Sequence, residues 1–322
     1  MTQTAFRDGT LAEAAAWQTV VLIPKGKGEF RGIGLVEVTW KIMTVILHRR
    51  LMTGIQLHDV LHGFREGRGT GTATLDAKLL QQLAAMREEV LYVIFLDLTK
   101  AYDALDRSRT LEILKGYGVG ERVQRLLTVY WERTTMVASA GSYYGKGFKG
   151  ERGVTQGDPL SPTIFNVVVD AVVRHWLQIA TQEAERRGER GKEGQHQAAL
   201  FYADDGMIAS SDPRWLKWAF TVLVGLFDRV GLRTNRKKNV KHDVQTVQHA
   251  GEQVGGNLRA HNDGGRTDAQ GEEDGKSDVW GLWKGDGGGV TRFPPYDSTR
   301  KGKGEEMGMD GRGHWRGGSA NV

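Results

Sequence analysis

The stretch FYADDGMIA (Phe201–Ala209) places two adjacent acids between apolar segments, which is typical of a β-hairpin whose turn carries the acids. A second stretch, LYVIFLDL (Leu91–Leu98), is short and apolar except for Asp97, and it predicts a buried strand. An ionised carboxylate among apolar neighbours is costly unless a cation or hydrogen bonds compensate it. These two stretches therefore point to a shared acidic site.

The three carboxylates have a chemistry that suits metal ions. Asp204 and Asp205 repel each other as neighbours, and a divalent cation would relieve that repulsion. Carboxylates with open coordination positions suit Mg²⁺, which prefers oxygen ligands and substrate phosphates. Two such ions can stabilise the attacking and leaving oxygens of a phosphoryl displacement. The alternative is a surface Asp-Asp turn with Asp97 as a strand-end cap, and each stretch taken alone favours it.

Composition restricts the class of protein. The chain has 322 residues, a formal net charge of +5 and no cysteine. The charge permits a nucleic-acid partner without requiring one, and the lack of cysteine excludes disulfides and thiolate metal sites. The N-terminus lacks the pattern of a signal peptide, and no apolar run is long enough to span a membrane. We therefore expect an intracellular protein of the cytoplasm or nucleus, not secreted and without a membrane partner.

Up to about Lys238, apolar runs alternate with turn signals. VVLIP (Val20–Pro24) predicts another buried strand, and Thr72–Met86 predicts an amphipathic helix. The apolar face expected for this helix consists of Leu75, Leu79, Leu83 and Met86. Strands that alternate with long helices indicate an α/β or α+β fold.

Ser161 and Pro162 predict the start of a further helix, with the hydroxyl at the cap and the proline in the first turn. The apolar pattern continues to about Ile179. From Asn239 onward the composition changes, because this segment holds 19 of the 44 glycines and few large apolar side chains. Such a segment cannot bury enough apolar surface to offset the entropy of ordering. We expect one domain over residues 1–240 and a largely disordered, Gly-rich tail over residues 241–322.

Six segments in order resemble the blocks of reverse transcriptases of non-LTR retrotransposons and group II introns. They are VVLIPKGKGEFRGIG (Val20–Gly34), HGFREGRGTGTAT (His62–Thr74), FLDLTKAYDALDRSRTLEIL (Phe95–Leu114), GVTQGDPLSPTIFNVVVDAVV (Gly153–Val173), FYADDGMIA (Phe201–Ala209) and GLRTNRKK (Gly231–Lys238). The resemblance implies an α+β fold, namely a right-hand polymerase palm with an antiparallel sheet packed on helices, plus a fingers subdomain. It also implies an RNA-directed DNA polymerase that takes an RNA template, a DNA primer and dNTPs. Its cofactor would be two Mg²⁺ ions, for which Mn²⁺ can substitute.

The same resemblance assigns roles to the acids and to one aromatic residue. It implies that Asp97 and Asp204 bind both metal ions and that Asp205 lies close in support. Tyr102 matches an aromatic gate whose ring would clash with a ribonucleotide 2′-hydroxyl; a core tyrosine is the alternative. Asp103 and Asp106 are expected to cap the following helix rather than bind metal.

Other residues match nucleotide-binding positions of the family. Gln156 and Gly157 match a turn beside the nascent base pair, where glycine lets the backbone approach a ligand closely. Arg31 lies in a Gly-rich loop after a strand, which suits triphosphate oxygens. The family usually has Arg-Pro-Ile where this chain has Arg31-Gly32-Ile33, and this loosens the loop.

Three lysines and two histidines complete the candidate set. Lys25 and Lys27 accompany Arg31 in the loop. Lys238 aligns with a lysine that could donate a proton to pyrophosphate, and a solvated surface lysine is an equal alternative. His58 and His62 have a spacing that could bind zinc on a helix, although no third ligand is evident nearby.

The resemblance ends abruptly after Lys238. If the reading frame is shifted by one nucleotide with permitted codons, Asn239–Gly251 can read TSNMTCKPCNMPG, and later segments supply Cys-x2-Cys and His-x4-His. Our hypothesis is a frame-shifted thumb and zinc-finger region; a genuine disordered extension is the alternative, and the nucleotide sequence across Lys238 decides. The expected protein is then fingers and palm alone, without a thumb or an upstream endonuclease.

Two other functions stay open. An RNA-dependent RNA polymerase shares the palm and the paired acids, but it usually carries glycine before the aspartates where this chain has Tyr202 and Ala203. A catalytically inactive relic that at most binds nucleic acid is the second alternative.

Overall fold

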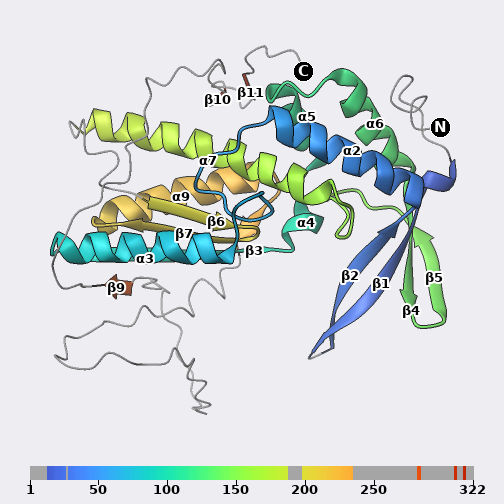
Figure 1. The fold of residues 1–322 in the computed structure, drawn as a ribbon, viewed down its shortest axis with the longest axis horizontal. Coiled ribbons are helices and arrows are strands. Elements are labelled where there is room, and N and C mark those ends of the chain that lie inside the picture. Colours follow the sequence, from blue (N-terminus) through green and yellow to red (C-terminus); the bar gives the residue numbers. More distant parts are fainter. Residues whose placement is uncertain are drawn as a thin grey trace, which may run out of the picture.

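Two sheets of four and five strands organise the part of the chain that the structure describes (Figure 1). The structure is a computed structural model, and it describes residues 13–26, 28–187, 198–234, 281–283, 308–309 and 315–316. The five-stranded sheet is antiparallel and has the order β6-β7-β3-β8, with β9 pairing β3 as well. Its strands are β3 (Leu91–Thr99), β6 (Ala198–Tyr202), β7 (Asp205–Ser210), β8 (Arg233–Thr234) and β9 (Gly281–Trp283). The predicted strand and the predicted hairpin are both confirmed.

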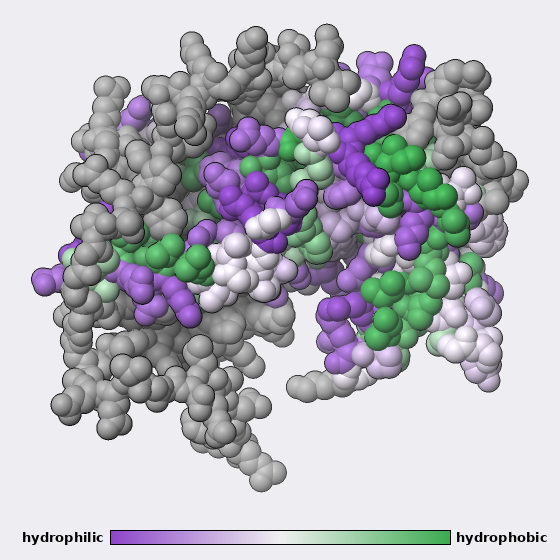
Figure 2. Space-filling view, viewed as in Figure 1, coloured by the Kyte–Doolittle hydropathy of each residue, from purple (hydrophilic) through white to green (hydrophobic). Residues whose placement is uncertain are grey.

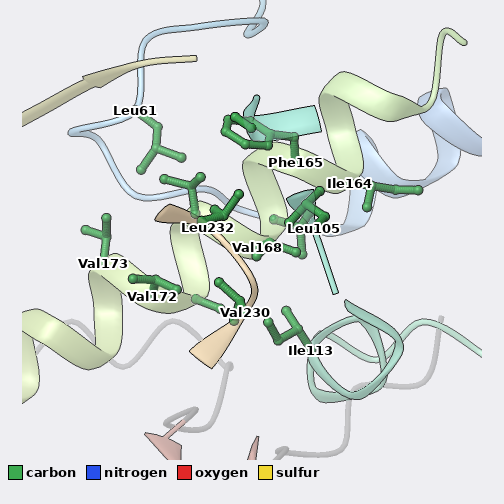
Figure 3. Close-up of a cluster of buried hydrophobic side chains, with 14 of the residues drawn as sticks. Leu61, Leu105, Ile113, Ile164, Phe165, Val168, Val172, Val173, Val230 and Leu232 are labelled. Atoms are coloured by element: carbon green, nitrogen blue, oxygen red, sulfur yellow. The ribbon is translucent and has the colours of Figure 1, made fainter. Parts of the chain in front are cut away.

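One face of this sheet lies on the main hydrophobic core. Ile94, Leu96 and Ile208 point into it and are almost fully buried. Helices α7 (Ser161–Arg186) and α9 (Pro213–Arg229) supply the facing side chains. Figure 3 shows apolar residues of α7 meeting side chains from loops and helices far away in the sequence, such as Leu61 and Val230. This core makes the sheet a rigid platform.

The opposite face of the sheet is only partly covered. Helix α3 (Thr70–Met86) packs over Leu91, Val93 and Met207 through its own Ala84. Further along β3 on the same face, Phe95 is 43% exposed. The acidic end of β3 and β7 therefore lies on the open part of this face.

Helix α3 is confirmed, but the expected packing face is wrong. Leu75 is 55% exposed, and the residues that pack on the sheet are mainly small. They are Ala77, Leu80 and Ala84, with Ala73 also buried. Alanine side chains let the helix approach the sheet closely, whereas the leucines predicted for this role would hold it further away.

Helix α7 begins where expected, but Ser161 is not its cap. The cap residue is Leu160, and Pro162 lies in the first turn. The Oδ1 atom of Asp158 accepts a hydrogen bond from the Leu160 N–H at 2.9 Å, so Asp158 satisfies the helix start instead. The helix runs to Arg186 because no glycine or proline interrupts it before Gly188.

The four-stranded sheet has the order β2-β1-β4-β5 and pairs distant segments. Its strands are β1 (Trp17–Gly26), β2 (Glu29–Val36), β4 (Thr135–Ala140) and β5 (Tyr143–Phe148). Strands β1 and β4 run parallel, whereas the other two pairs are antiparallel. Arg31 lies inside β2 opposite Ile23, so the expectation of a loop at Arg31-Gly32-Ile33 is wrong. The turn falls earlier, where Gly26 and Gly28 adopt positive φ angles.

Apolar side chains gather on the surface over the β1–β2 hairpin and the N-terminal end of α2 (Val38–Gly54) (Figure 2). Exposed members of this surface are Ile23, Phe30, Leu35, Val38 and Ile42. This part of the fold is held by its strand pairing more than by a buried core.

Three helices lie between β3 of one sheet and β4 of the other, namely α4 (Ala101–Ala104), α5 (Arg107–Gly116) and α6 (Glu121–Arg133). The short helix η1 (Glu13–Ala16) precedes β1. Asp106 caps α5 by accepting a hydrogen bond from the Arg109 N–H at 3.0 Å, as predicted. Asp103 lies within α4 and caps nothing, so that expectation is wrong, and its burial raises the pKa of its carboxyl.

Little of the predicted tail belongs to the described residues. Besides β9, they include β10 (Gly308–Met309) and β11 (Trp315–Arg316), which pair with each other. The predictions of disorder and of a shifted frame concern segments that otherwise lie outside the described residues. Within the described ranges, no helix is both long enough and apolar enough to cross a membrane.

A buried carboxylate ties two other segments to α7. Asp170 is fully buried and accepts hydrogen bonds from the His58 N–H at 2.5 Å and from the Tyr117 hydroxyl. Arg174 adds an ion pair, with its Nε atom 2.6 Å from Oδ2 of Asp170. Arg174 also donates to the Gln56 carbonyl, so this cluster holds the segment that leads into the site.

We predict that Asp170→Ala lowers the free energy of unfolding by about 3–5 kcal/mol, because it leaves Arg174 and two donors without their buried partner. Urea unfolding followed by circular dichroism measures this change. Glu185→Ala removes an exposed acid from the same helix and is expected to stay within about 0.5 kcal/mol of the wild type. Equal stabilities of the two variants would contradict the role of Asp170.

Candidate active site

The register of β3 and β7 brings the three acids to one place. Asp97 lies directly opposite Asp205 in the antiparallel ladder. The Leu98 N–H donates to the Asp204 carbonyl at 3.1 Å, which fixes the turn against β3. Asp97 is half-buried, and Asp204 and Asp205 are exposed. Two carboxylate groups thus share one sheet face beside a third in the turn.

The hairpin turn is tight and strained. Tyr202 pairs with Asp205, so the turn consists of Ala203 and Asp204. Ala203 has a φ of 53°, a left-handed conformation that costs free energy for any residue with a Cβ. Gly63 lies against it, and a Cβ added there would be 2.5 Å from the Ala203 nitrogen. Only a glycine at position 63 permits this close approach.

A loop along β6 supports the hairpin from outside. The His62 N–H donates to the Phe201 carbonyl at 2.8 Å, and the Phe201 N–H donates to the Val60 carbonyl at 2.7 Å. His62 is buried; its Nδ1 lies 3.0 Å from the Thr72 hydroxyl and its Nε2 lies 3.2 Å from Asp76. These contacts attach the loop to α3 and occupy both ring nitrogens of His62.

Tyr102 lies in α4, just after the strand that carries Asp97. Its ring stacks on Phe165 of α7 with centroids 5.2 Å apart and an interplanar angle of 11°. Burial, together with the charge of Asp204, raises the pKa of Tyr102 well above its ordinary value. Tyr102 therefore lies within electrostatic reach of the acids and stays neutral. Both the gate and the core interpretations are compatible with a half-buried ring.

Gln156 and Gly157 lie in a loop that contacts β2 at one end and α4 at the other. The Gly34 N–H of β2 donates to the Gln156 carbonyl at 2.7 Å. Gly157 has a φ of 119°, and an added Cβ would lie 2.5 Å from the Gly34 carbonyl oxygen. Glycine at 157 permits a close backbone approach as expected, but the partner is β2. The other end of the loop is held by the Val154 N–H, which donates to the Tyr102 carbonyl at 2.8 Å.

Polar side chains next to this loop connect β1 to the start of α7. Gln18 is buried, donates to the Tyr130 hydroxyl and accepts from the Thr155 hydroxyl at 3.1 Å. The Tyr130 ring stacks on Trp40, whose Nε1 donates to Asp158 at 2.7 Å. This chain of contacts runs from β1 through α6 and α2 to the start of α7.

Arg107 orders the approach to the same loop. Its Nε donates to the Gly153 carbonyl at 2.9 Å, and its guanidinium lies over the Trp131 ring at 5.6 Å. Gly153 has a φ of 79° and packs directly on Tyr102 and Asp103. The segment before Gln156 is therefore fixed relative to Tyr102.

Two of the predicted basic residues lie on the four-stranded sheet. Arg31 and Lys25 are exposed on β2 and β1. Arg31 lies three residues before Gly34 on β2, and the Gly34 N–H donates to the Gln156 carbonyl. Strand β2 therefore connects Arg31 to Gln156. Lys27 and Lys238 lie outside the described residues.

The carboxylates offer the right donors for Mg²⁺, but they are not preassembled around a metal ion. Carboxylate oxygens that reach solvent suit Mg²⁺ and leave positions for water and phosphate. Among the described residues, no three histidine or acidic side chains already form a metal-ligand group. Exposed side chains change rotamer readily, so ligand binding can turn them toward one another.

Two residues that contribute to the site were not predicted from the sequence. Gly63 lies in His62–Thr74, the segment that resembles a family block. That resemblance is the signal from which a role for Gly63 in the site could have been predicted. Gln18 offered none, because a glutamine at the start of a strand looks like a surface residue.

A half-covered antiparallel sheet with paired acids at a hairpin defines a polymerase palm. The fold is shared with telomerase from Candida tropicalis, solved in complex with a fragment of telomeric RNA. The TM-score is 0.50 at 15% identity, and the match covers 71% of this chain and 41% of that one. The apo telomerase from the same organism matches with the same TM-score.

Sequence comparison then gives the family. A profile described as reverse transcriptase (RNA-dependent DNA polymerase) matches residues 23–253, so the chain belongs to the reverse transcriptase family. It is similar to the Pol polyproteins of R2 retrotransposable elements from Popillia japonica and Drosophila melanogaster. Identities are 28% and 27%, over 69% and 71% of this chain. The chain spans only 31% and 22% of those two relatives.

We predict that His62 makes the protein less stable in mild acid. Burial lowers the pKa of His62, although Asp76 opposes this shift. Below about pH 6.5, His62 becomes protonated in the unfolded chain but stays neutral in the folded chain, where its pKa is lower. The free energy of unfolding therefore decreases as the pH falls from the unfolded pKa of His62 toward its folded pKa. Unfolding free energies of His62→Gln and of the wild type, measured from about pH 7 to pH 5, test this. The variant should lose less stability, and parallel curves would contradict the assignment.

Proposed function

We propose that this chain is the fingers and palm of an RNA-directed DNA polymerase of a retrotransposon, which transfers dNTPs onto a primer 3′-hydroxyl. The single observation that carries the proposal is the pairing of Asp97 with Asp205 beside Asp204. Family membership supports the reaction class. The RNA template and DNA primer are proposed from the family, and the likeness to R2 elements supports a retrotransposon origin.

The proposed roles follow from position. Asp97 and Asp204 would hold the metal ions, with Asp205 in support from the opposite strand. Magnesium bound there would supply the charge that activates the primer hydroxyl and neutralises the phosphates, and manganese could replace it. The chain itself contributes alignment, because the turn is fixed against β3 by the Leu98 hydrogen bond.

The incoming nucleotide would lie between the acids and the loop at Gln156 and Gly157. The amide of Gln156 would contact the base or sugar, and Arg31 would bind triphosphate oxygens. Tyr102, whose ring is stacked on Phe165, would meet the sugar and would clash with a 2′-hydroxyl there. Since the loop is hydrogen-bonded to both Gly34 and Tyr102, these contacts would be organised before substrate arrives.

The limits of the domain are also part of the proposal. We place the fingers and palm in residues 1–240, with Lys238 as a possible last substrate contact. Residues 241–322 have two interpretations. They are either a Gly-rich tail or a frame-shifted thumb and zinc-finger region. Sequencing the nucleotides across Lys238 separates them, because early stop codons in the shifted frame would end the second interpretation.

We predict that Asp97→Asn and Asp204→Asn each reduce magnesium-dependent primer extension on an RNA template by on the order of 10³-fold. Each change removes a charge that the metal ions need, while it keeps the shape of the side chain. Asp228→Asn changes an exposed acid on α9 and should extend like the wild type. Equal extension by the wild type and Asp204→Asn would indicate an inactive relic that at most binds nucleic acid.

We predict that the wild type incorporates dNTPs in preference to rNTPs and that Tyr102→Val reduces this preference by about tenfold or more. The smaller side chain would make room for a 2′-hydroxyl. Single-nucleotide incorporation with matched dNTP and rNTP concentrations measures the ratio. A wild type that prefers rNTPs would support the RNA-dependent RNA polymerase alternative instead.

A further inference from the structure

Phe64 combines two features that a residue kept only for stability would not have. The residue is 49% exposed, and its φ is 55°. A bulky side chain in the left-handed region is uncommon and strained. An exposed aromatic ring in a strained backbone gains little from burial, so another interaction must account for its position.

The residues on both sides of Phe64 are held firmly. The Asn166 side chain of α7 donates to the Gly63 carbonyl at 2.8 Å. Arg65 donates from one guanidinium nitrogen to the His58 carbonyl at 2.7 Å and to the Leu61 carbonyl at 2.9 Å. A change of backbone conformation at Phe64 would therefore disturb the buried hydrogen bond at Gly63 and the contacts of Arg65.

This conformation directs the ring to Tyr102. The Phe64 and Tyr102 rings meet edge to face, with centroids 6.5 Å apart and an interplanar angle of 84°. Tyr102 also stacks on Phe165, which is fully buried. Edge-to-face and stacked contacts at these distances are the favoured geometries of aromatic pairs. Tyr102 is thus fixed by one ring from α7 and one from the loop.

We infer that Phe64 is a positioning residue for Tyr102, which sets the orientation of the ring that meets the nucleotide sugar. The inference rests on the proposed function, since it gives Tyr102 its role as the gate. Phe64 acts through Tyr102 and not on the substrate itself. The loss of Phe64 would let the Tyr102 ring turn away, and discrimination against a 2′-hydroxyl would fall.

The same loop also connects the gate to the acids. Gly63 lies against Ala203 of the hairpin turn, and Phe64 follows it directly. The nucleotide-selecting ring and the carboxylates are therefore placed by consecutive residues. A shift of this loop would therefore move both together.

The first test compares single-nucleotide incorporation of dNTP and rNTP by the full chain. Phe64→Ala is expected to lower the ratio of the two kcat/KM values by about fivefold, the order of one aromatic contact, with a smaller effect on kcat for dNTP. Phe64→Tyr keeps the ring and should restore the wild-type ratio. Phe148→Ala removes a ring of similar exposure, 45%, from β5 and should leave the ratio unchanged. An unchanged ratio in Phe64→Ala, or an equal rise of KM for both sugars, would overturn the inference.

The second test does not depend on turnover. In protein labelled with fluorotyrosine, the Tyr102 fluorine resonance is identified by its loss in Tyr102→Phe. Phe64→Ala should shift and broaden this resonance, and Phe148→Ala should not. If the wild type extends no primer, the proposed function fails, but an altered Tyr102 resonance still supports the positioning role. A resonance unchanged by Phe64→Ala overturns that role whether or not the chain polymerises.

Discussion

The register between β3 and β7 is the constraint on which the site depends. Side chains alternate between the two faces of a sheet, so a slip of one residue would turn Asp97 into the core and Leu96 out of it. Burial of Ile94, Leu96 and Ile208 opposes such a slip, at about 1.5–3 kcal/mol for each side chain. The hydrophobic core thus determines on which face the carboxylates appear, and α3 leaves that part of the face open.

The segments around the acids are joined mainly through backbone atoms. At Gly63, Gly153 and Gly157, an added Cβ would lie 2.5–2.6 Å from a backbone atom, and at Gly34 it would lie 2.3 Å from the Thr155 side chain. Such contacts bring loops closer together than side chains would allow, and they leave little freedom for adjustment. These contacts connect β2, which carries Arg31, with the loop at Gln156 and Gly157 and with α4, which carries Tyr102. A separate contact, at Gly63, joins its loop to the hairpin turn of the acids.

Much of the fold could be predicted from local pattern, and the failures have physical causes. The apolar runs around Asp97 and Asp204 specify strands because few other structures accommodate them. The packing face of α3 could not be predicted, because the leucine set and the alanine set both have helical spacing; the distance of approach to the sheet decides between them. Asp158 replaced Ser161 at the start of α7 for a similar reason, since a cap depends on which oxygen the preceding loop presents. Gln18, Gly63 and Phe64 act through contacts distant in the sequence, which no local pattern records.

The parallel pairing of β1 with β4 has a consequence for how the protein is made. Strand β4 begins about a hundred residues after β2 ends, so the four-stranded sheet cannot form until that segment has left the ribosome. At ordinary rates of synthesis, this delay is roughly 5–20 s. During it, the edge of β1 that later pairs with β4 stays open, beside Ile23, Phe30 and Leu35, which are exposed in the folded protein as well. A nascent chain with such a segment is a natural client for chaperones, and the interval before β4 emerges is when it is most prone to aggregate.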